Sequence, residues 1–383
     1  MKKIIIVGLL LTGILISNID NTEPENIEET KAVFISYIEI NDYIKNKDYS
    51  ISKSNIRKII NNVRTMNLNT IVLQVRAASD SIYNSKIFPK SLYLVNSEED
   101  AYYDVLAYFI KEAHKYNVKV IAWINPYRIR TTSNINTITE NNPAYKYLNT
   151  DTIYIENGIY YNPSKKEVTD LIVKGVEEVL EYEIDGLLFD DYFYPNTTID
   201  ENDYQEYIQN NDYVSPENYR LETINNMIRK VYEKCKEKNI PFGISPDGNI
   251  ENNYNTHYAD VKTWMRKDGY IDFIMPQIYY GFYNSSRDYI NTLKEWESYL
   301  LNESIDLYVA LAFYKVGQYD KYAKDGSNEW LTNDDIIMRE VLLSRNSKNY
   351  KGFSLFRYNN IFDENTFTNN TVKEIENLKK IIK

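Results

Sequence analysis

The sequence of 383 residues contains only two histidines and one cysteine. His114 and His257 cannot build a three-histidine zinc site, because such a site needs one more histidine than the chain has. Cys235 alone excludes a disulfide framework and a cysteine-cluster metal site. The sequence therefore predicts a protein without a bound metal, and it disfavours metal-dependent deacetylation.

Glycine and basic residues are also in short supply. The chain has 12 glycines, and no glycine-rich phosphate-binding loop follows a predicted strand. Lys and Arg number 44 against 55 Asp and Glu, so the formal charge is 44 − 55 = −11. Nucleic-acid binding draws most of its affinity from basic residues on phosphates. We therefore expect no cofactor and no nucleic-acid partner.

The residue types that are abundant favour a carbohydrate ligand. Tyrosine occurs 37 times, and hydrophobic residues make up 43% of the chain, enough for a large core. Sugars lay their apolar faces on aromatic rings, while their hydroxyls bind carboxylate, amide and phenol groups. The composition supplies all of these groups in quantity.

The N-terminus has the pattern of an export signal. A basic start at residues 1–3 precedes an apolar run at 4–16, and a polar stretch follows. The run is shorter than the roughly 20 residues of an ordinary membrane-spanning helix. We expect residues 1–18 to be a signal peptide or membrane anchor and residues 19–31 to be a linker. The protein would then be exported and extracellular or associated with the cell envelope.

The rest of the chain alternates strand-like apolar runs with segments of helical period. Strands are predicted at residues 32–38, 70–75, 118–124, 186–189, 242–245, 273–278, 307–312 and 352–356. Helices are predicted at residues 55–66, 103–116, 166–182, 221–237, 258–266, 289–300 and 334–344. Eight such repeats predict an α/β fold of the (β/α)₈ TIM-barrel type over residues 32–383, closed by a helix at 371–382. An open doubly wound sheet is the alternative.

Polar and aromatic residues follow the predicted strands at their carboxyl ends, which is where the active sites of such barrels lie. The strand ends carry Glu39; Gln74 and Arg76; Asn125, Tyr127 and Arg128; Asp190, Asp191 and Tyr192; Asp247; Gln277, Tyr279 and Tyr280; Lys315; Arg357 and Asn359. Because all strands of a parallel barrel end on one side, we expect a single polar, concave site.

Several of these segments resemble the glycosyl hydrolase-like 10 family, also called the domain of unknown function 187 group. They are Val-Leu-Gln-Val-Arg at 72–76, Trp-Ile-Asn-Pro-Tyr-Arg at 123–128, Asp-Gly-Leu-Leu-Phe-Asp-Asp-Tyr-Phe-Tyr-Pro at 185–195, Phe-Gly-Ile-Ser-Pro at 242–246 and Met-Pro-Gln-Ile-Tyr at 275–279. The resemblance covers residues 31–357 in order. It implies an exported or envelope-anchored barrel that hydrolyses bacterial cell-wall glycan, with peptide-stripped peptidoglycan strands as substrate. Asp247 departs from the family, where an apolar residue is expected after Ser-Pro.

The catalytic residues expected for glycoside cleavage are one carboxylic acid and usually a second carboxylate. Asp190 and Asp191 are the obvious pair, but neighbouring strand residues point to opposite faces unless the strand ends between them. We therefore expect one of them to act with a partner from another strand end, Glu39 or Asp247. A structural role beside Arg76 or backbone N–H groups is the alternative for the Asp pair. An N-acetyl group of the substrate acting as nucleophile is a further possibility.

Binding residues are predicted from the same strand ends. Arginines could hold a carboxylate of the glycan or neutralise the aspartates. Amides would bind hydroxyls, and tyrosines would stack on sugar rings or belong to the core. The candidates are Arg76, Arg128 and Arg357; Asn125, Gln277 and Asn359; and Tyr127, Tyr192, Tyr279 and Tyr280.

Two hypotheses remain from the sequence. The first is a metal-free glycoside hydrolase that acts on wall polysaccharide through carboxyl groups, and the second is a non-catalytic glycan-binding barrel. Residues 196–216 are long and tyrosine-rich, and they would form a lid over the site or a surface insertion. We expect His114, Asp185 and Cys235 to be structural.

Overall fold

The computed structural model describes residues 29–96 and 103–382. The predicted signal or anchor at 1–18 and most of the predicted linker lie outside the described residues. Within the described part of the chain, no helix is both long and apolar enough to cross a membrane.

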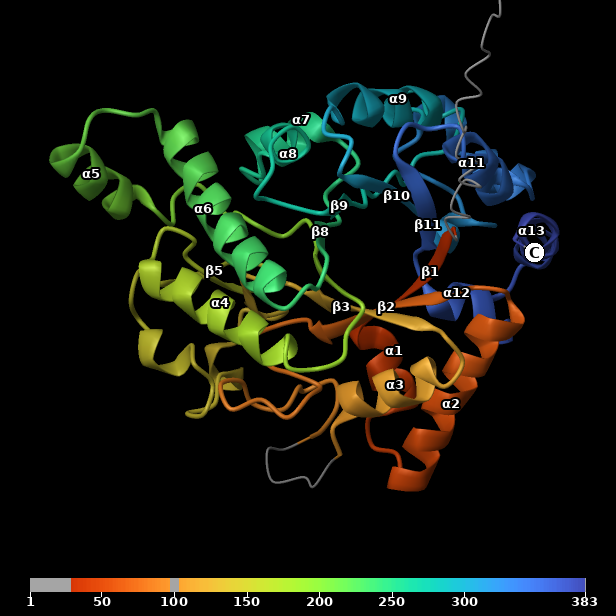
Figure 1. The fold of residues 1–383 in the computed structure, drawn as a ribbon, viewed down its shortest axis with the longest axis horizontal. Coiled ribbons are helices and arrows are strands. Elements are labelled where there is room, and N and C mark those ends of the chain that lie inside the picture. Colours follow the sequence, from red (N-terminus) through yellow and green to blue (C-terminus); the bar gives the residue numbers. More distant parts are fainter. Residues whose placement is uncertain (1–28, 97–102, 383) are drawn as a thin grey trace, which may run out of the picture.

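Eight parallel strands form a closed barrel, as Figure 1 shows. Around the barrel they are β1 (Thr30–Ile35), β2 (Thr70–Arg76), β3 (Lys119–Ile124), β7 (Gly186–Phe189), β8 (Phe242–Ile244), β9 (Phe273–Ile274), β10 (Asp306–Leu311) and β11 (Tyr350–Leu355), which pairs with β1. Each predicted strand coincides with one of them. The predicted (β/α)₈ barrel is confirmed, and the open sheet is excluded because β1 pairs with both β2 and β11.

Helices surround the barrel on its outside (Figure 1). Those near predicted positions are α2 (Tyr49–Thr65), α3 (Val105–His114), α4 (Lys166–Val179), α6 (Pro216–Glu237), α8 (Val261–Trp264), α9 (Tyr289–Tyr299), α11 (Ile336–Ser344) and α13 (Asn369–Ile381). Short helices in the loops are α1 (Tyr37–Tyr43), α5 (Glu201–Asn210), α7 (Ile250–Asn255), α10 (Glu329–Thr332) and α12 (Tyr358–Phe362). The C-terminal helix α13 packs against α11 and α12.

The loop between β3 and α4 adds a small three-stranded sheet of β4 (Arg128–Arg130), β6 (Ile159–Tyr161) and β5 (Ile153–Ile155). Single 3₁₀ turns complete the loops at η1 (Ile135–Thr137), η2 (Tyr145–Tyr147), η3 (Phe313–Lys315), η4 (Lys324–Gly326) and η5 (Glu364–Thr366).

The first strand ends earlier than predicted because a helix cap interrupts it. The prediction ran to residue 38, but β1 ends at Ile35 and Ser36 caps α1. The Ser36 hydroxyl accepts a hydrogen bond from Ile38 N (3.2 Å), and Glu39 accepts one from Ser36 N (2.9 Å). This reciprocal capping box pairs the backbone N–H groups of Ser36 and Ile38 within the turn. In a continuing strand, those groups would have to pair with neighbouring strands.

The predicted linker is too long at its C-terminal end. β1 begins at Thr30, and Glu29 already packs on the barrel. Its carboxylate accepts hydrogen bonds from Arg345 Nη2 (2.7 Å) and the Tyr350 hydroxyl (2.7 Å). Residues 29–31 therefore belong to the barrel, because their polar groups are paired within it.

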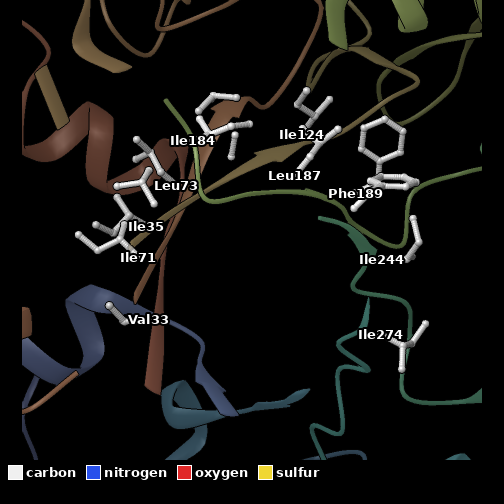
Figure 2. Packing of buried hydrophobic residues seen from close by; sticks show 14 of the residues in the cluster. Val33, Ile35, Ile71, Leu73, Ile124, Ile184, Leu187, Phe189, Ile244 and Ile274 are labelled. Carbon is white, nitrogen blue, oxygen red and sulfur yellow. The ribbon is translucent and has the colours of Figure 1, made fainter. Parts of the chain in front are cut away.

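Two separate layers form the core, as expected from side chains that alternate along each strand. Outward-facing residues pack between the strands and the helices, and Figure 2 shows them on several strands: Val33, Ile35, Ile71, Leu73, Ile124, Leu187, Phe189, Ile244 and Ile274. Inward-facing residues fill the barrel: Ala32, Phe34, Val72, Ile121, Trp123, Leu188, Phe273, Met275 and Ala310. The inner layer supports the site above it.

We predict that the barrel interior has no room for one more carbon at Gly243. An added Cβ there would lie 2.3 Å from the ring of Phe273, whereas the nearest atom to an added Cβ at Gly186 is 3.4 Å away. Overpacking a core costs about 1–3 kcal/mol. We expect Gly243→Ala to lower the free energy of unfolding by that amount in urea denaturation. Gly186→Ala, the matched control on β7, should have little effect. Equal losses for the two variants would contradict the packing.

Candidate active site

A cavity of about 300 Å³ opens at the carboxyl ends of the strands, and residues in or after all eight strands line it. We call it the inner cavity. Its lining comprises Phe34, Ser36, Tyr37, Ile38, Gln74, Trp123, Arg128, Asp190, Asp191, Tyr192, Ser245, Gln277, Tyr279, Tyr314, Phe356 and Arg357. This confirms the expectation of one polar and aromatic site on that side of the barrel.

A second cavity of about 450 Å³ adjoins the first, and we call it the outer cavity. Asp191, Gln277 and Tyr279 line both, so these residues stand at the junction. A larger hollow of about 580 Å³ lies between α2 and the C-terminal helices, away from the strand-end carboxylates. The candidate site is therefore the pair of joined cavities, because they contain the carboxylates.

Asp190 is a buried carboxylate held in place by two donors. Its Oδ2 accepts hydrogen bonds from Trp123 Nε1 (2.9 Å) and Asn125 Nδ2 (3.2 Å). Burial raises the pKa of Asp190, against the opposing effects of the Arg128 charge and these two hydrogen bonds. Its position and charge are thus controlled by residues of β3 and the loop after it.

Asp191 is the second carboxylate of the cavity, and its pKa is strongly raised. Part of its surface is exposed at the cavity wall, but the surrounding protein removes most of its hydration. This burial, followed by the neighbouring Asp190 charge and the Asp247 charge, raises the pKa of Asp191 to about 7. Gln277 Nε2 donates to its Oδ1 (3.3 Å). Asp191 can therefore carry a proton near neutral pH.

The expectation that Asp190 and Asp191 would face opposite sides is wrong. It assumed that both residues belong to the strand, but β7 ends at Phe189. Beyond that point the alternation of a pleated strand no longer applies. Both carboxylates line the inner cavity, and the charge of Asp190 helps to raise the pKa of Asp191.

Glu39 does not reach the cavities. Its side chain has no exposed surface, and both oxygens are used. Oε1 accepts from Arg357 Nη1 (2.6 Å), and Oε2 accepts from the Ser36 hydroxyl (2.6 Å). The structure therefore does not bring Glu39 together with the Asp pair as a proton donor, and instead makes it the residue that positions Arg357 in the inner cavity.

Asp247 lies in the outer cavity, where its carboxylate is also engaged. Oδ1 accepts from Asn249 N (2.7 Å) and Oδ2 from Asn252 Nδ2 (2.7 Å). The Pro-Asp-Gly turn thus has its own hydrogen bonds. Asp247 acts on the pair through its charge, by helping to raise the pKa of Asp191.

Two of the predicted binding residues, Arg76 and Tyr127, face away from the inner cavity. A register shift between Gln74 and Arg76 turns Arg76 outward, where it lies over the Phe88 ring (4.2 Å) and against Gly175 of α4. Tyr127 is buried in the outer core layer. These two predictions are corrected, because a bulge and core packing decided the direction of the side chains.

Asn125 also stays behind the wall of the inner cavity. It donates to Asp190 and accepts from Arg128 N (3.1 Å), so it links these two residues. Asn359 is similarly buried and donates to Asp42 (3.1 Å). Neither residue lines the inner or the outer cavity. Asn125 was predicted to bind a ligand directly, and in this structure it contacts Asp190 and Arg128 instead.

The remaining predicted binding residues do lie in the cavities. Arg128 donates from Nε to Ala77 O (2.9 Å) and lies over the ring of Tyr192 (5.1 Å), which is 47% exposed. Gln277 and Tyr279 stand at the junction, and Arg357 lines the inner cavity. Tyr280 lines the outer cavity.

Several lining residues were not predicted as site residues, notably Trp123, Ser245 and Tyr314. Trp123 and Ser245 stand inside segments that carry the family resemblance, which was the available signal. Gln74 was noted at a strand end without a role. Tyr314 contacts Tyr279 edge to face and Phe356 contacts it at a tilt, with ring centroids 5.8 Å apart in each pair.

Residues 196–216 do not line either cavity. They form α5 at the outer edge of the molecule beside α6, and Asp200 pairs with Arg220 of α6 (2.8 Å). The segment is an anchored surface insertion in this structure.

At the other end of the barrel, Asp185 accepts from Val120 N (2.7 Å) and pairs with His114 (2.8 Å), which are structural contacts as predicted. Cys235 is buried.

Comparison with known proteins agrees with the geometry. The sequence profile of the glycosyl hydrolase-like 10 family matches residues 29–328. The chain is 29% identical to glycosyl hydrolase YngK of Bacillus subtilis, over 91% of this chain and 71% of that protein. It is 31% identical to glycosyl hydrolase DigH of Escherichia coli, over 78% of this chain and 74% of that protein.

Solved structures share the barrel at low sequence identity. The glycoside hydrolase domain of PgaB from Bordetella bronchiseptica has a TM-score of 0.58 at 13% identity, over 93% of this chain and 99% of that one. An alpha-L-fucosidase from Paenibacillus thiaminolyticus has a TM-score of 0.57 at 12% identity, over 92% of this chain and 49% of that one. These similarities establish the fold, a TIM barrel shared with glycoside hydrolases.

The raised pKa of Asp191 predicts a pH-dependent stability. Between about pH 4, the ordinary aspartate value, and pH 7, the folded protein keeps a proton that the unfolded chain has lost. The contribution of Asp191 to the free energy of unfolding therefore falls as the pH rises through this window. We expect Asp191→Asn to be more stable, relative to wild type, at pH 8 than at pH 4 in urea denaturation. Asp212→Asn, at an exposed residue outside both cavities, controls for the lost charge. A difference independent of pH would argue against the raised pKa.

Proposed function

The chain belongs to the glycosyl hydrolase-like 10 family, and on that premise we propose that it hydrolyses glycosidic bonds with Asp191 as the general acid. The observation that carries this proposal is the raised pKa of Asp191, about 7, beside a second buried carboxylate in the cavity. A glycosidic oxygen is a poor leaving group until it is protonated, so the catalyst needs an acid that keeps its proton near neutral pH.

The position of Asp191 supports the same role. It lies at the junction of the inner and outer cavities, so a sugar unit in each would place the connecting oxygen beside its carboxyl group. Proton transfer to that oxygen needs hydrogen-bond reach, which the junction offers. The bond to be cleaved would thus span the two cavities.

Asp190 is the partner in this proposal. Positive charge develops on the sugar ring in the transition state of glycoside cleavage. Asp190 lines the inner cavity but not the outer one, so its carboxylate faces the sugar in the inner cavity, which must then be the unit that gains the charge. Trp123 and Asn125 hold this carboxylate in place. Asp190 would stabilise the charge as nucleophile or base, or by orienting an N-acetyl group of the sugar.

The proposed substrate is the glycan strand of the bacterial cell wall after its peptides have been removed. Such strands carry lactyl carboxylates, and Arg128 and Arg357 line the inner cavity within a chain of net charge −11. Of the three side-chain nitrogens of Arg128, only Nε has a hydrogen-bond partner among the described residues. Its terminal nitrogens can therefore pair with a carboxylate. Export through residues 1–18 would bring the protein to such a substrate.

We expect Asp191→Asn to lower kcat on purified glycan strands by about 100-fold or more, because general acid catalysis contributes at least that factor. The loss should be smaller on an aryl glycoside whose leaving group needs no proton, and wild-type kcat should fall as the pH rises above about 7. Products are followed by mass spectrometry. Asp212→Asn should cleave at the wild-type rate. If wild type binds the strands but releases no shorter glycan, the protein is a glycan-binding barrel and the hydrolase proposal fails.

The proposed recognition of the lactyl carboxylate by Arg128 can be tested separately. We expect Arg128→Gln to raise KM about tenfold on peptide-stripped wall strands, because a charge-assisted hydrogen bond is lost. The variant should change KM much less on chitooligosaccharides of equal length, which have no lactyl group. Arg266→Gln, at an exposed residue outside both cavities, is the matched control. Equal increases on both substrates would contradict recognition of the carboxylate.

A further inference from the structure

Three buried polar atoms of the inner cavity have no hydrogen-bond partner among the described residues: Gln74 Nε2, Asp190 Oδ1 and Ser245 Oγ. The Tyr192 backbone N–H lies near enough to Asp190 to lower its pKa, but it completes no hydrogen bond to Oδ1. Buried polar groups in folded proteins are nearly always paired, and each exception needs a reason. Buried atoms without a partner also occur elsewhere in the described residues, but these three belong to residues that line one cavity, where a polar ligand could pair with them.

The three residues share one side of the barrel. Gln74 of β2 is in register with Trp123 of β3, whose Nε1 donates to Asp190 Oδ2 at the end of β7. Ser245 follows β8, and its backbone N–H donates to Phe189 O (2.7 Å). Gln74, Asp190 and Ser245 therefore follow one another around the barrel at the ends of neighbouring strands, with Trp123 between the first two.

The hydrogen bonds already made fix what each free atom can do. Gln74 Oε1 accepts from Tyr37 N (3.0 Å), so Nε2 remains as the free donor of this amide. Asp190 uses Oδ2 for Trp123 and Asn125, so Oδ1 remains as an acceptor. The Ser245 hydroxyl can donate or accept. The complementary ligand group must offer both an acceptor and a donor.

Aromatic rings surround these polar atoms. Phe34 contacts Trp123 and Phe356, with ring centroids 5.4 and 5.5 Å apart, and Phe356 in turn contacts Tyr279 at 5.8 Å. All four rings line the inner cavity. A ligand group here therefore also needs an apolar part, because the rings offer it no hydrogen bond.

We propose that Gln74, Asp190 and Ser245 form a subsite for the acetamido group of an N-acetylhexosamine. The amide N–H would donate to Asp190 Oδ1, and its carbonyl would accept from Gln74 Nε2 and the Ser245 hydroxyl. The methyl group would lie against the rings. A hydroxyl in the same place could bind the polar atoms, but it has no methyl group to bury. This subsite rests on the proposed function, since it assumes that a glycan occupies the cavity.

The test compares three tetrasaccharides that share one backbone and linkage and differ only in the substituent on the second ring carbon. They are chitotetraose, its de-N-acetylated form and cellotetraose. Binding is measured by calorimetry in the Asp191→Asn variant, which lacks the proton donor and so does not consume the ligand. Chitotetraose should bind at least about tenfold more tightly than the other two, because they leave amide and methyl contacts unmade.

Adding Ser245→Ala should weaken chitotetraose binding about three- to tenfold, the effect of one lost hydrogen bond, and leave cellotetraose binding unchanged. The Ser245 hydroxyl has no partner to lose within the described protein, so folding should be unaffected. Ser354→Ala is the matched control: Ser354 is also buried in the barrel, but it bonds Met275 and lies outside the cavity.

No measurable binding of chitotetraose, equal binding of chitotetraose and cellotetraose, or an equal loss of both in Ser245→Ala would overturn the subsite. The outcome is separable from the hydrolase proposal, because binding needs no turnover. A protein that cleaves N-acetylated and hydroxyl glycans equally well would keep the hydrolase function and lose this inference.

Discussion

The burial of two adjacent carboxylates at the end of β7 is the constraint on which the site depends. Asp190 and Asp191 share a cavity in which neither is fully hydrated, so ionising both is unfavourable. The protein gives the two neighbours different surroundings. Trp123, Asn125 and the charge of Arg128 favour the ionised form of Asp190, whereas Asp191 has the weaker contact with Gln277. Different environments for two carboxyl groups are how one site obtains both an acid and a base.

Residues that never touch a ligand hold this arrangement in place. Asn125 connects Asp190 to the backbone of Arg128, and Glu39 fixes Arg357 while its other oxygen caps α1. Below them the aromatic and aliphatic side chains of the inner core layer fill the barrel. The cavity walls are thus supported by these hydrogen bonds and by close packing, whereas Gln74 Nε2, Asp190 Oδ1 and Ser245 Oγ have no partner among the described residues.

The sequence predicted the fold well because the strands and helices of the barrel each have a recognisable local pattern of apolar and polar residues. Apolar runs such as residues 70–75 and 186–189 favour strands covered on both faces, and eight of them alternating with amphipathic helices favour a closed barrel over an open sheet. It also predicted the correct end of the barrel, since all strand ends point one way. The same reasoning placed Asp190 and Asp191 at that end, but it expected the partner of one of them to be Glu39 or Asp247 from another strand end, whereas Asp190 and Asp191 both line the inner cavity. The sequence did not predict the directions of single side chains: Arg76 turns outward, Tyr127 joins the core, and Glu39 is buried beside Arg357, outside both cavities.

The sequence by itself determined the barrel, the chemical groups available to it and the end at which they gather, since these depend on periodicity and composition. Only the tertiary structure decided which strand-end side chains enter the cavity. The reason is that a side chain reverses direction when a strand gains or loses one residue. β2 gains one at the shift before Arg76, β1 stops at the cap of Ser36, and β7 stops just before the two aspartates. Each of these small events is settled by pairing and packing with residues distant in the chain.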